Sequence, residues 1–96
     1  MRKSNESSLG EAINQLIDHY RLRDRLNEVR LKAAWDTLMG GAISNRTIGL
    51  KIKNEVLHIS VSSAPLREEL LYQKERIMEL MNKELEGEYI KDLLIR

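Results

Sequence analysis

The 96-residue chain contains no cysteine and no phenylalanine, and it has one tryptophan and one proline. Without cysteine it forms no disulfide and offers no thiolate to a metal ion, which favours a reducing compartment. No apolar run approaches the roughly 18 residues of a membrane-spanning helix, and the polar first residues lack the apolar core of a secretory signal. We therefore expect a cytoplasmic protein without membrane contact, metal or cofactor.

Motifs for catalysis are missing as well. The sequence has no Gly-x-Ser-x-Gly elbow and no phosphate-binding loop, since Gly40-Gly41 lacks the lysine that such a loop requires. Neither His19 nor His58 has a second histidine or a cysteine at a metal-binding spacing. Glu68 and Glu69 are adjacent in a predicted helix, where their side chains diverge by about 100°. We expect no catalytic residue and no enzymatic activity.

A first amphipathic helix is predicted near the N-terminus. Ser8 and Glu11 have the spacing of a capping box. Between Leu9 and Tyr20 the apolar residues recur three and four positions apart, as on one face of a helix. Residues 1–7 are polar and are expected to form a flexible N-terminus, and residues 8–96 are long enough for one domain.

A second apolar stripe runs from Leu31 to Met39. The charged segment 21–25 separates the two stripes and is interpreted as a connection, or as a bend in one continuous helix. Gly40-Gly41 is expected to end the second helix, because glycine takes the left-handed conformation at a helix end with little strain. Trp35 lies on the stripe and is expected in the core, where its indole buries a large apolar area, in preference to stacking on a base.

A β-hairpin is predicted at 47–62. Segments 47–53 and 56–62 alternate apolar and polar residues around Asn54-Glu55, and asparagine tolerates the positive φ of a two-residue turn. This turn fixes the register, and a slip by one residue would bury lysines. The apolar pairs expected to face each other are Ile52 with Leu57, Leu50 with Ile59, and Ile48 with Val61.

The remaining segments complete an α/β (α+β) pattern. Pro65 suits the first turn of a helix that runs to about Leu85 and is ended by Gly87. Residues 89–95 are predicted to form a last strand, parallel to the second strand because a helical crossover joins them. Its inward face is either Tyr89, Leu93 and Ile95, or Ile90 and Leu94. The order is α-α-β-β-α-β, with a three-stranded mixed sheet and the helices on one face. The expected core residues are Leu31, Trp35, Leu38, Leu50, Ile52, Leu57, Ile59, Val61, Leu66, Leu70, Ile77 and Met81.

Positive charge is concentrated in two places, although the net charge is only +1. Residues 21–32 contain five basic side chains and two acidic ones. The outer face of the predicted hairpin carries lysines and a histidine, and Lys91 or Arg96 extends that face from the last strand. Such groups can neutralise nucleic-acid phosphates, although lysines also commonly protect exposed sheets. The candidate nucleic-acid-binding residues are Arg21, Arg23, Arg25, Arg30, Lys32, Lys51, Lys53, His58 and Lys91.

Several short patterns occur together in an order that resembles the DciA-like bacterial proteins, from about residue 9 to 96. They are Leu31-x-x-x-Trp35-x-x-x-x-Gly40, Leu57-x-Ile-x-Val61-x-Ser-Ala, Leu66-x-x-Glu69-Leu70, Asn82, and Ile90-x-Asp92-Leu-x-Ile95-Arg. The resemblance implies a KH-like domain that binds DNA and assists loading of the replicative helicase DnaB. This sequence lacks the Gly-x-x-Gly loop of true KH domains, so reading of bases in the KH manner is not expected.

Two classes of function follow from these observations. The first is a replication accessory that contacts the helicase and DNA, including single-stranded DNA. The second is a protein–protein interaction module, with a homodimer as one form, since segment 66–88 carries seven glutamates against four basic residues and opposite charges can pair. An RNA-binding adaptor without a replication role is a variant of the first class, because nothing in the sequence distinguishes a 2′-hydroxyl.

Overall fold

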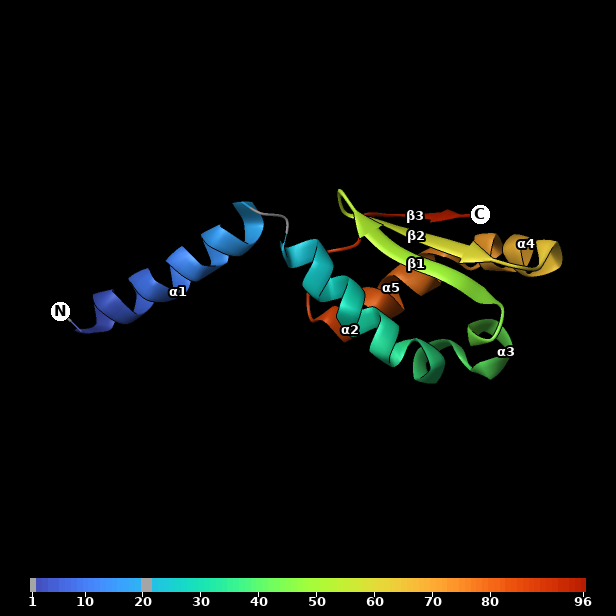
Figure 1. Cartoon of the computed structure of the whole chain (residues 1–96), viewed down its shortest axis with the longest axis horizontal. Coiled ribbons are helices and arrows are strands. Elements are labelled where there is room, and N and C mark those ends of the chain that lie inside the picture. Colours follow the sequence, from blue (N-terminus) through green and yellow to red (C-terminus); the bar gives the residue numbers. More distant parts are fainter. Residues whose placement is uncertain (1, 20–21) are drawn as a thin grey trace.

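The computed structural model describes the backbone of residues 2–19 and 22–96, and the side chains of residues 8–16 and 22–96. It is an α+β fold in which three strands lie in the order β1-β2-β3. Figure 1 shows α2 and α5 beneath the sheet, while α1 extends away from the rest of the chain. The elements are α1 (Arg2–His19), α2 (Leu22–Met39), α3 (Gly41–Ser44), β1 (Thr47–Lys53), β2 (Val56–Val61), α4 (Ala64–Tyr72), α5 (Lys74–Leu85) and β3 (Asp92–Ile95). The predicted class, element order and mixed sheet are confirmed.

The hairpin has the predicted turn and register. Asn54 and Glu55 both have positive φ, 51° and 66°, which is the backbone of a type I′ turn. Leu50 pairs with Ile59, and Ile52 pairs with Leu57, as expected.

The expected pair of Ile48 with Val61 is wrong. A bulge between Thr47 and Gly49 shifts the register, so that Thr47 is the partner of Val61. Ile48 is left 73% exposed. A bulge adds one residue to one strand and reverses the faces beyond it, which a strict alternation of residues does not reveal.

The last strand is parallel to β2, as predicted, with Leu57 opposite Leu93 and Ile59 opposite Ile95. It is shorter than expected, because it begins at Asp92. Ile90, Leu93 and Ile95 are buried, whereas Tyr89 is half-buried and Leu94 is exposed. The buried residues therefore come partly from one and partly from the other of the two inward faces that the sequence left open. The alternation of inward and outward residues does not extend to Tyr89 and Ile90, because residues 88–91 lie before the strand begins.

The first helix begins earlier than predicted. Its backbone is helical from Arg2, so Ser8 lies inside the helix and the capping box does not mark its start. The flexibility expected for residues 1–7 stays a prediction. Of the residues named from the sequence, Tyr20, Arg21 and the side chain of His19 lie outside those described.

The connection predicted at 21–25 is wrong for residues 22–25, since α2 begins at Leu22, and residue 21 lies outside the described residues. This helix ends before Gly40, as expected, and Gly40 has a φ of 86°. The long helix predicted from Pro65 begins where expected, with the Ser63 hydroxyl accepting a hydrogen bond from the Leu66 N–H at 3.3 Å. It divides at Gln73 into α4 and α5.

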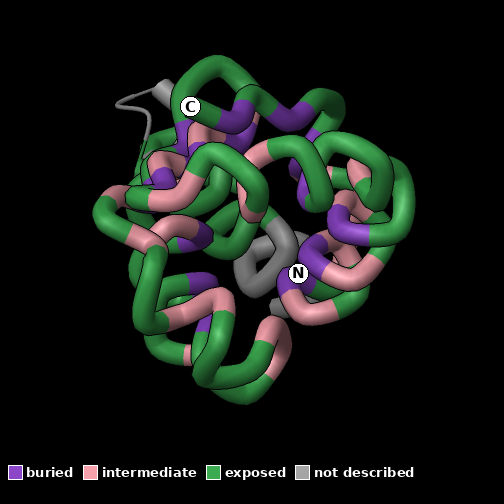
Figure 2. Tube along the Cα trace, turned by 90° about the vertical axis from the view of Figure 1, so that its right-hand side faces the viewer, coloured by how far each residue is buried: buried purple, intermediate pink, exposed green. Residues whose placement is uncertain are grey.

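The core lies between the sheet and the helices, and Figure 2 shows the buried residues within the body of the fold. Ten of the twelve predicted core residues are buried, while Leu38 and Leu66 are half-buried against the core. The buried Trp35 donates from Nε1 to Thr47 Oγ1 at 2.9 Å, which confirms its predicted place. The core also contains Leu85, Ile90, Leu93 and Ile95. Among the described residues, no helix is long and apolar enough to cross a membrane.

Candidate nucleic-acid interface

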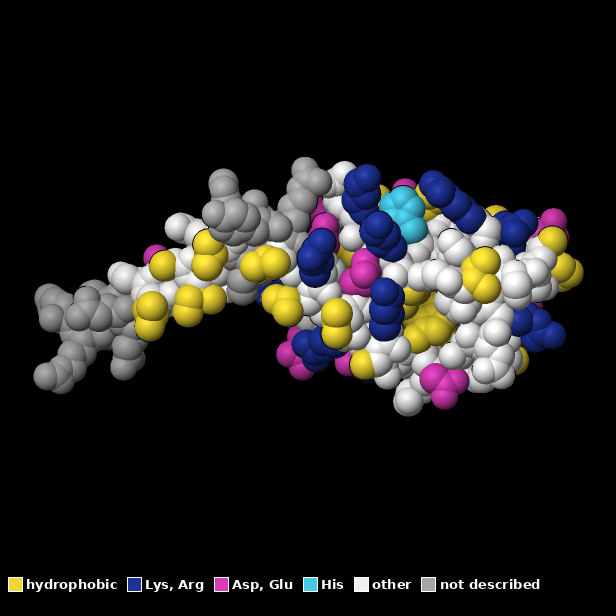
Figure 3. Space-filling model, in the orientation of Figure 1, with side chains coloured by type: hydrophobic (Ala, Val, Ile, Leu, Met, Phe, Trp, Pro, Cys, Tyr) yellow, Lys and Arg dark blue, Asp and Glu magenta, His cyan; other side chains and the backbone are white. Residues whose placement is uncertain are grey.

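A shallow hollow lies between α2 and the edge strand β1. Its volume is about 530 Å³, and its lining includes Arg25 and Val29 from α2 with Lys51 and Lys53 from β1. Figure 3 shows Lys and Arg side chains on this face of the molecule, near the histidine. We call Arg25, Lys51 and Lys53 the basic cluster. The helix and the strand thus bring together side chains from the two basic regions of the sequence.

The edge of β1 positions α2 beside it. Glu28 Oε1 accepts a hydrogen bond from the Ile52 N–H at 2.9 Å, and Asp24 Oδ2 accepts one from the Asn54 N–H at 3.2 Å. An edge strand presents unpaired amides, so these two carboxylates satisfy donors that would otherwise face solvent. The edge of β1 and the turn that follows it therefore receive both of the acidic groups that line the hollow, Asp24 and Glu28.

The other oxygen of Glu28 also has a partner, because Lys32 Nζ lies 3.3 Å from Glu28 Oε2. Within the described part of the chain, no ion pair joins Arg25, Lys51 or Lys53 to an acidic residue. Three cations beside one another without acidic partners are available to bind an anion.

The open face of the sheet continues from this cluster. Lys51 is the cross-strand partner of His58, and His58 is the partner of Leu94 on β3. Lys51 and Lys53 are exposed and His58 is half-buried. The backbone of Arg96 is paired with Ile59 and Val61, which keeps it in the sheet two residues beyond Leu94. Of the two residues expected to extend this face, Arg96 therefore does so, by its alternation with Leu94.

The structure places other candidates elsewhere. Arg30 Nε is 3.6 Å from Glu84 Oε2, and Arg30 Nη2 is 3.6 Å from Glu86 Oε1. Arg23 donates to Asn14 Oδ1 at 3.2 Å, and its guanidinium lies 5.8 Å from the centre of the Tyr89 ring. Helical phase explains the division, because the side chains of residues 25 and 30 point about 140° apart around α2. Sequence clustering does not separate these two directions.

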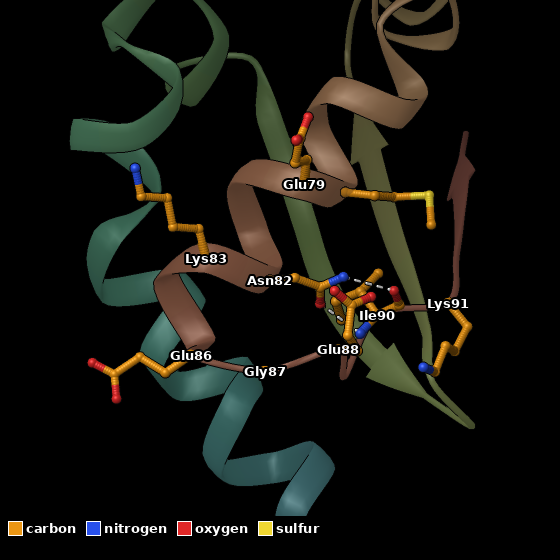
Figure 4. A pocket seen from close by; sticks show the side chains of 9 residues that line it. Glu79, Asn82, Lys83, Glu86, Gly87, Glu88, Ile90 and Lys91 are labelled. Atoms are coloured by element: carbon orange, nitrogen blue, oxygen red, sulfur yellow. Dashed lines mark hydrogen bonds between the residues drawn. The ribbon is translucent and has the colours of Figure 1, made fainter.

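Lys91 belongs to a different hollow, of about 670 Å³, beside α5. Figure 4 shows this hollow with its glutamates at positions 79, 86 and 88, and with Lys91 at one side. Asn82 lies in its wall, where its Nδ2 donates to the Ile90 carbonyl at 3.0 Å and its Oδ1 accepts from the Ile90 N–H at 2.7 Å. Three carboxylates make this region a poor site for a phosphate backbone.

The pKa of Asp92, at the start of β3, is shifted by its neighbours. The Lys74 ammonium hydrogen-bonds the carboxylate, with Nζ 2.7 Å from Oδ1, and the Leu93 N–H also donates to Oδ1 at 2.8 Å. Both contacts favour the ionised form and lower the pKa of Asp92 below its ordinary value. In the described residues no group of three His, Asp or Glu side chains could hold a metal ion.

Comparison with known proteins identifies the family. The chain matches the family model described as "Dna[CI] antecedent, DciA" over residues 8–95. No curated protein matches the sequence. The matched range contains the whole sheet, the helices that cover it and the basic cluster. The chain therefore belongs to the DciA family, whose members take part in loading the DnaB-type replicative helicase.

Proposed function

We propose that this protein is a non-enzymatic accessory of DNA replication that binds DNA through the basic cluster and the adjoining sheet face while it assists loading of the DnaB-type helicase. The observation that carries the DNA-binding part is the grouping of Arg25, Lys51 and Lys53 without acidic partners. Membership in the DciA family carries the helicase part. Such a protein is expected in the bacterial cytoplasm, where the chromosome is replicated.

The chemistry of the cluster favours contact with phosphates over reading of bases. Each neutralised phosphate releases counterions, with a salt slope of about 0.7 per contact on single strands and about 0.9 on duplex DNA. Stacking of bases requires aromatic side chains, and the residues lining this hollow include none. Binding of this kind is independent of sequence, which suits a protein that acts wherever a helicase is placed on single-stranded DNA.

The test is fluorescence anisotropy with a labelled single-stranded oligonucleotide at several salt concentrations. The variant Lys51→Glu/Lys53→Glu should weaken binding at least tenfold and reduce the salt slope by about 1.4, since two phosphate contacts are lost. Arg76→Glu/Lys83→Glu is a matched control, because it changes the net charge equally at exposed positions of α5. The control should bind nearly as the wild type does.

Two results would contradict the DNA-binding part. Equal weakening in both variants would mean that net charge, and not the cluster, governs binding. Undetectable or salt-independent binding by the wild type would remove the proposal altogether. An RNA oligonucleotide of the same sequence, measured in parallel, tests the variant in which RNA is the ligand.

The helicase part needs a separate experiment. In a pull-down with both proteins purified, the tagged protein should retain the DnaB-type helicase of the same bacterium, both with and without nuclease treatment. Retention that survives nuclease indicates direct contact between the two proteins. If the helicase is not retained under either condition, the replication role is wrong, even where DNA binding by the basic cluster is intact.

A further inference from the structure

The long helix α1 leaves its apolar stripe uncovered. Leu9, Ile13 and Leu16 lie along one face of this helix, and their exposed fractions range from 49% to 64%. All described side chains of α1 are exposed. Figure 1 shows α1 projecting from the domain, and Figure 3 shows hydrophobic side chains along it that continue onto α2. A stripe of this kind usually packs against another apolar surface.

α2 carries a second uncovered stripe. Its core-facing side holds Leu31 and Trp35, which are buried. The opposite side holds Leu22, Leu26 and Val29, whose exposed fractions range from 38% to 65%. The exposed Ala33 continues this row by one more turn. The helix therefore has two apolar faces, and only one of them is used by the core.

The two stripes are mirror images in their spacing about position 21. Leu16 and Leu26 lie five residues before and after it, and Ile13 and Val29 lie eight residues before and after it. Leu9 and Ala33 complete the pattern at twelve residues. If α1 and α2 pack antiparallel, the two members of each of these three pairs meet at the same level.

The length of the connection decides between packing within one chain and packing between two. Only residues 20 and 21 separate the helices. Packed helices lie about 8–10 Å apart, and three consecutive Cα–Cα steps reach at most about 10 Å when fully extended. Closure within one chain thus requires the most stretched connection, whereas docking on a second copy does not. Short hinge connections are known to favour exchange of a segment between chains.

We infer that two copies of this chain exchange α1, so that the α1 stripe of each copy packs antiparallel on the outer α2 stripe of the other. Reciprocal docking buries both stripes of both copies. The six larger side chains expose roughly 500 Å² per chain, so an exchanged pair would bury about 1,000 Å², the lower bound for a specific interface.

Charge at the edges of the stripes supports α1 on α2. The α2 stripe is flanked by Arg25, Arg30 and Lys32, so two α2 stripes facing each other would bring like charges together. The α1 stripe is flanked by the uncharged Gly10 and Ala12. Pairing α1 with α2 avoids this repulsion, and it also covers the α2 stripe, which pairing of two α1 stripes would leave exposed. It requires neither the helicase nor DNA.

Sedimentation equilibrium of the full chain tests the inference. The mass should approach 22.4 kDa, twice the 11.2 kDa of one chain, and fall on dilution. Ile13→Glu and Val29→Lys should each be monomeric where the wild type is dimeric, and circular dichroism should show both folded because these side chains are exposed. An equimolar mixture of the two should regain the dimer, since one contact is then native and the other pairs opposite charges. Gln15→Glu is the matched control and should dimerise normally.

Disulfide trapping distinguishes exchange from closure within a chain, and the absence of native cysteine removes background. The double variant Ile13→Cys/Val29→Cys should oxidise to a covalent dimer, while neither single variant should cross-link with itself. Three outcomes would overturn the inference: a monomeric mass at all concentrations, an intrachain disulfide in the double variant, or efficient self-linking of Ile13→Cys.

Discussion

Asn82 fastens the segment that leads into β3 to the last turns of α5, and its replacement gives a sharp test of the fold. Its amide bonds both polar groups of the Ile90 peptide, the N–H at 2.7 Å and the carbonyl at 3.0 Å, as Figure 4 shows. Ile90 is 1% exposed, so few water molecules can replace these contacts. The variant Asn82→Ala removes both hydrogen bonds and adds no new group.

The expected loss follows from the cost of unsatisfied groups. Leaving one buried donor or acceptor without a partner costs about 1–3 kcal/mol. Asn82 itself is half-buried, so partial hydration of the gap reduces the penalty. We expect Asn82→Ala to lower the free energy of unfolding by about 2–4 kcal/mol, which is roughly 10–20 °C in Tm for a domain of this size.

Urea unfolding monitored by the fluorescence of the single tryptophan, Trp35, measures this loss. Asn82→Asp is the informative companion, because it keeps the acceptor for the Ile90 N–H and replaces the donor by a second oxygen. Its deficit relative to the wild type should shrink as the pH falls toward 4 and the carboxyl group becomes protonated. A loss below about 1 kcal/mol for Asn82→Ala would refute the role of the Ile90 contacts.

Two further predictions concern stability. Trp35→Ala should cost about 3–5 kcal/mol, measured by circular dichroism, because it empties a buried site in the core and leaves the Thr47 hydroxyl without its donor; a cost below about 1 kcal/mol would contradict burial in the core. Lys74 lowers the pKa of Asp92 in the folded state, so this contact stabilises the fold above the ordinary pKa of aspartate and is lost as the pH falls through the folded value. Asp92→Asn should therefore make unfolding less sensitive to pH below about pH 4, and an unchanged acid limb would argue against the contact.

Sequence reasoning succeeded where one local signal and one nonlocal requirement agreed. The alternation in the hairpin and the Asn54-Glu55 turn specify the same register, and burial of lysines penalises any other. The parallel placement of β3 follows from the helical crossover, whatever the details of the helices. These features need only the periodicity of the chain and the chirality of its connections.

Local signals failed where packing or extension overrode them. The capping box at Ser8 does not mark the start of the helix, because the helix extends further toward the N-terminus through residues that include neither proline nor glycine. The helix predicted from Pro65 bends at Gln73 because α4 covers β2 and β3 whereas α5 runs between β3 and α2. A straight helix would not follow both surfaces.

The sequence by itself determined the class of fold, the hairpin, the tryptophan core and the presence of positive charge near residues 21–32 and 51–58. Only the tertiary structure decided which charges act together, because that depends on helical phase and on the neighbours of each side chain. It turned Arg30 toward α5 and placed Arg25 beside Lys51 and Lys53. It also left the stripes of α1 and α2 uncovered, since a periodic apolar pattern predicts a surface to be buried and does not specify which surface buries it.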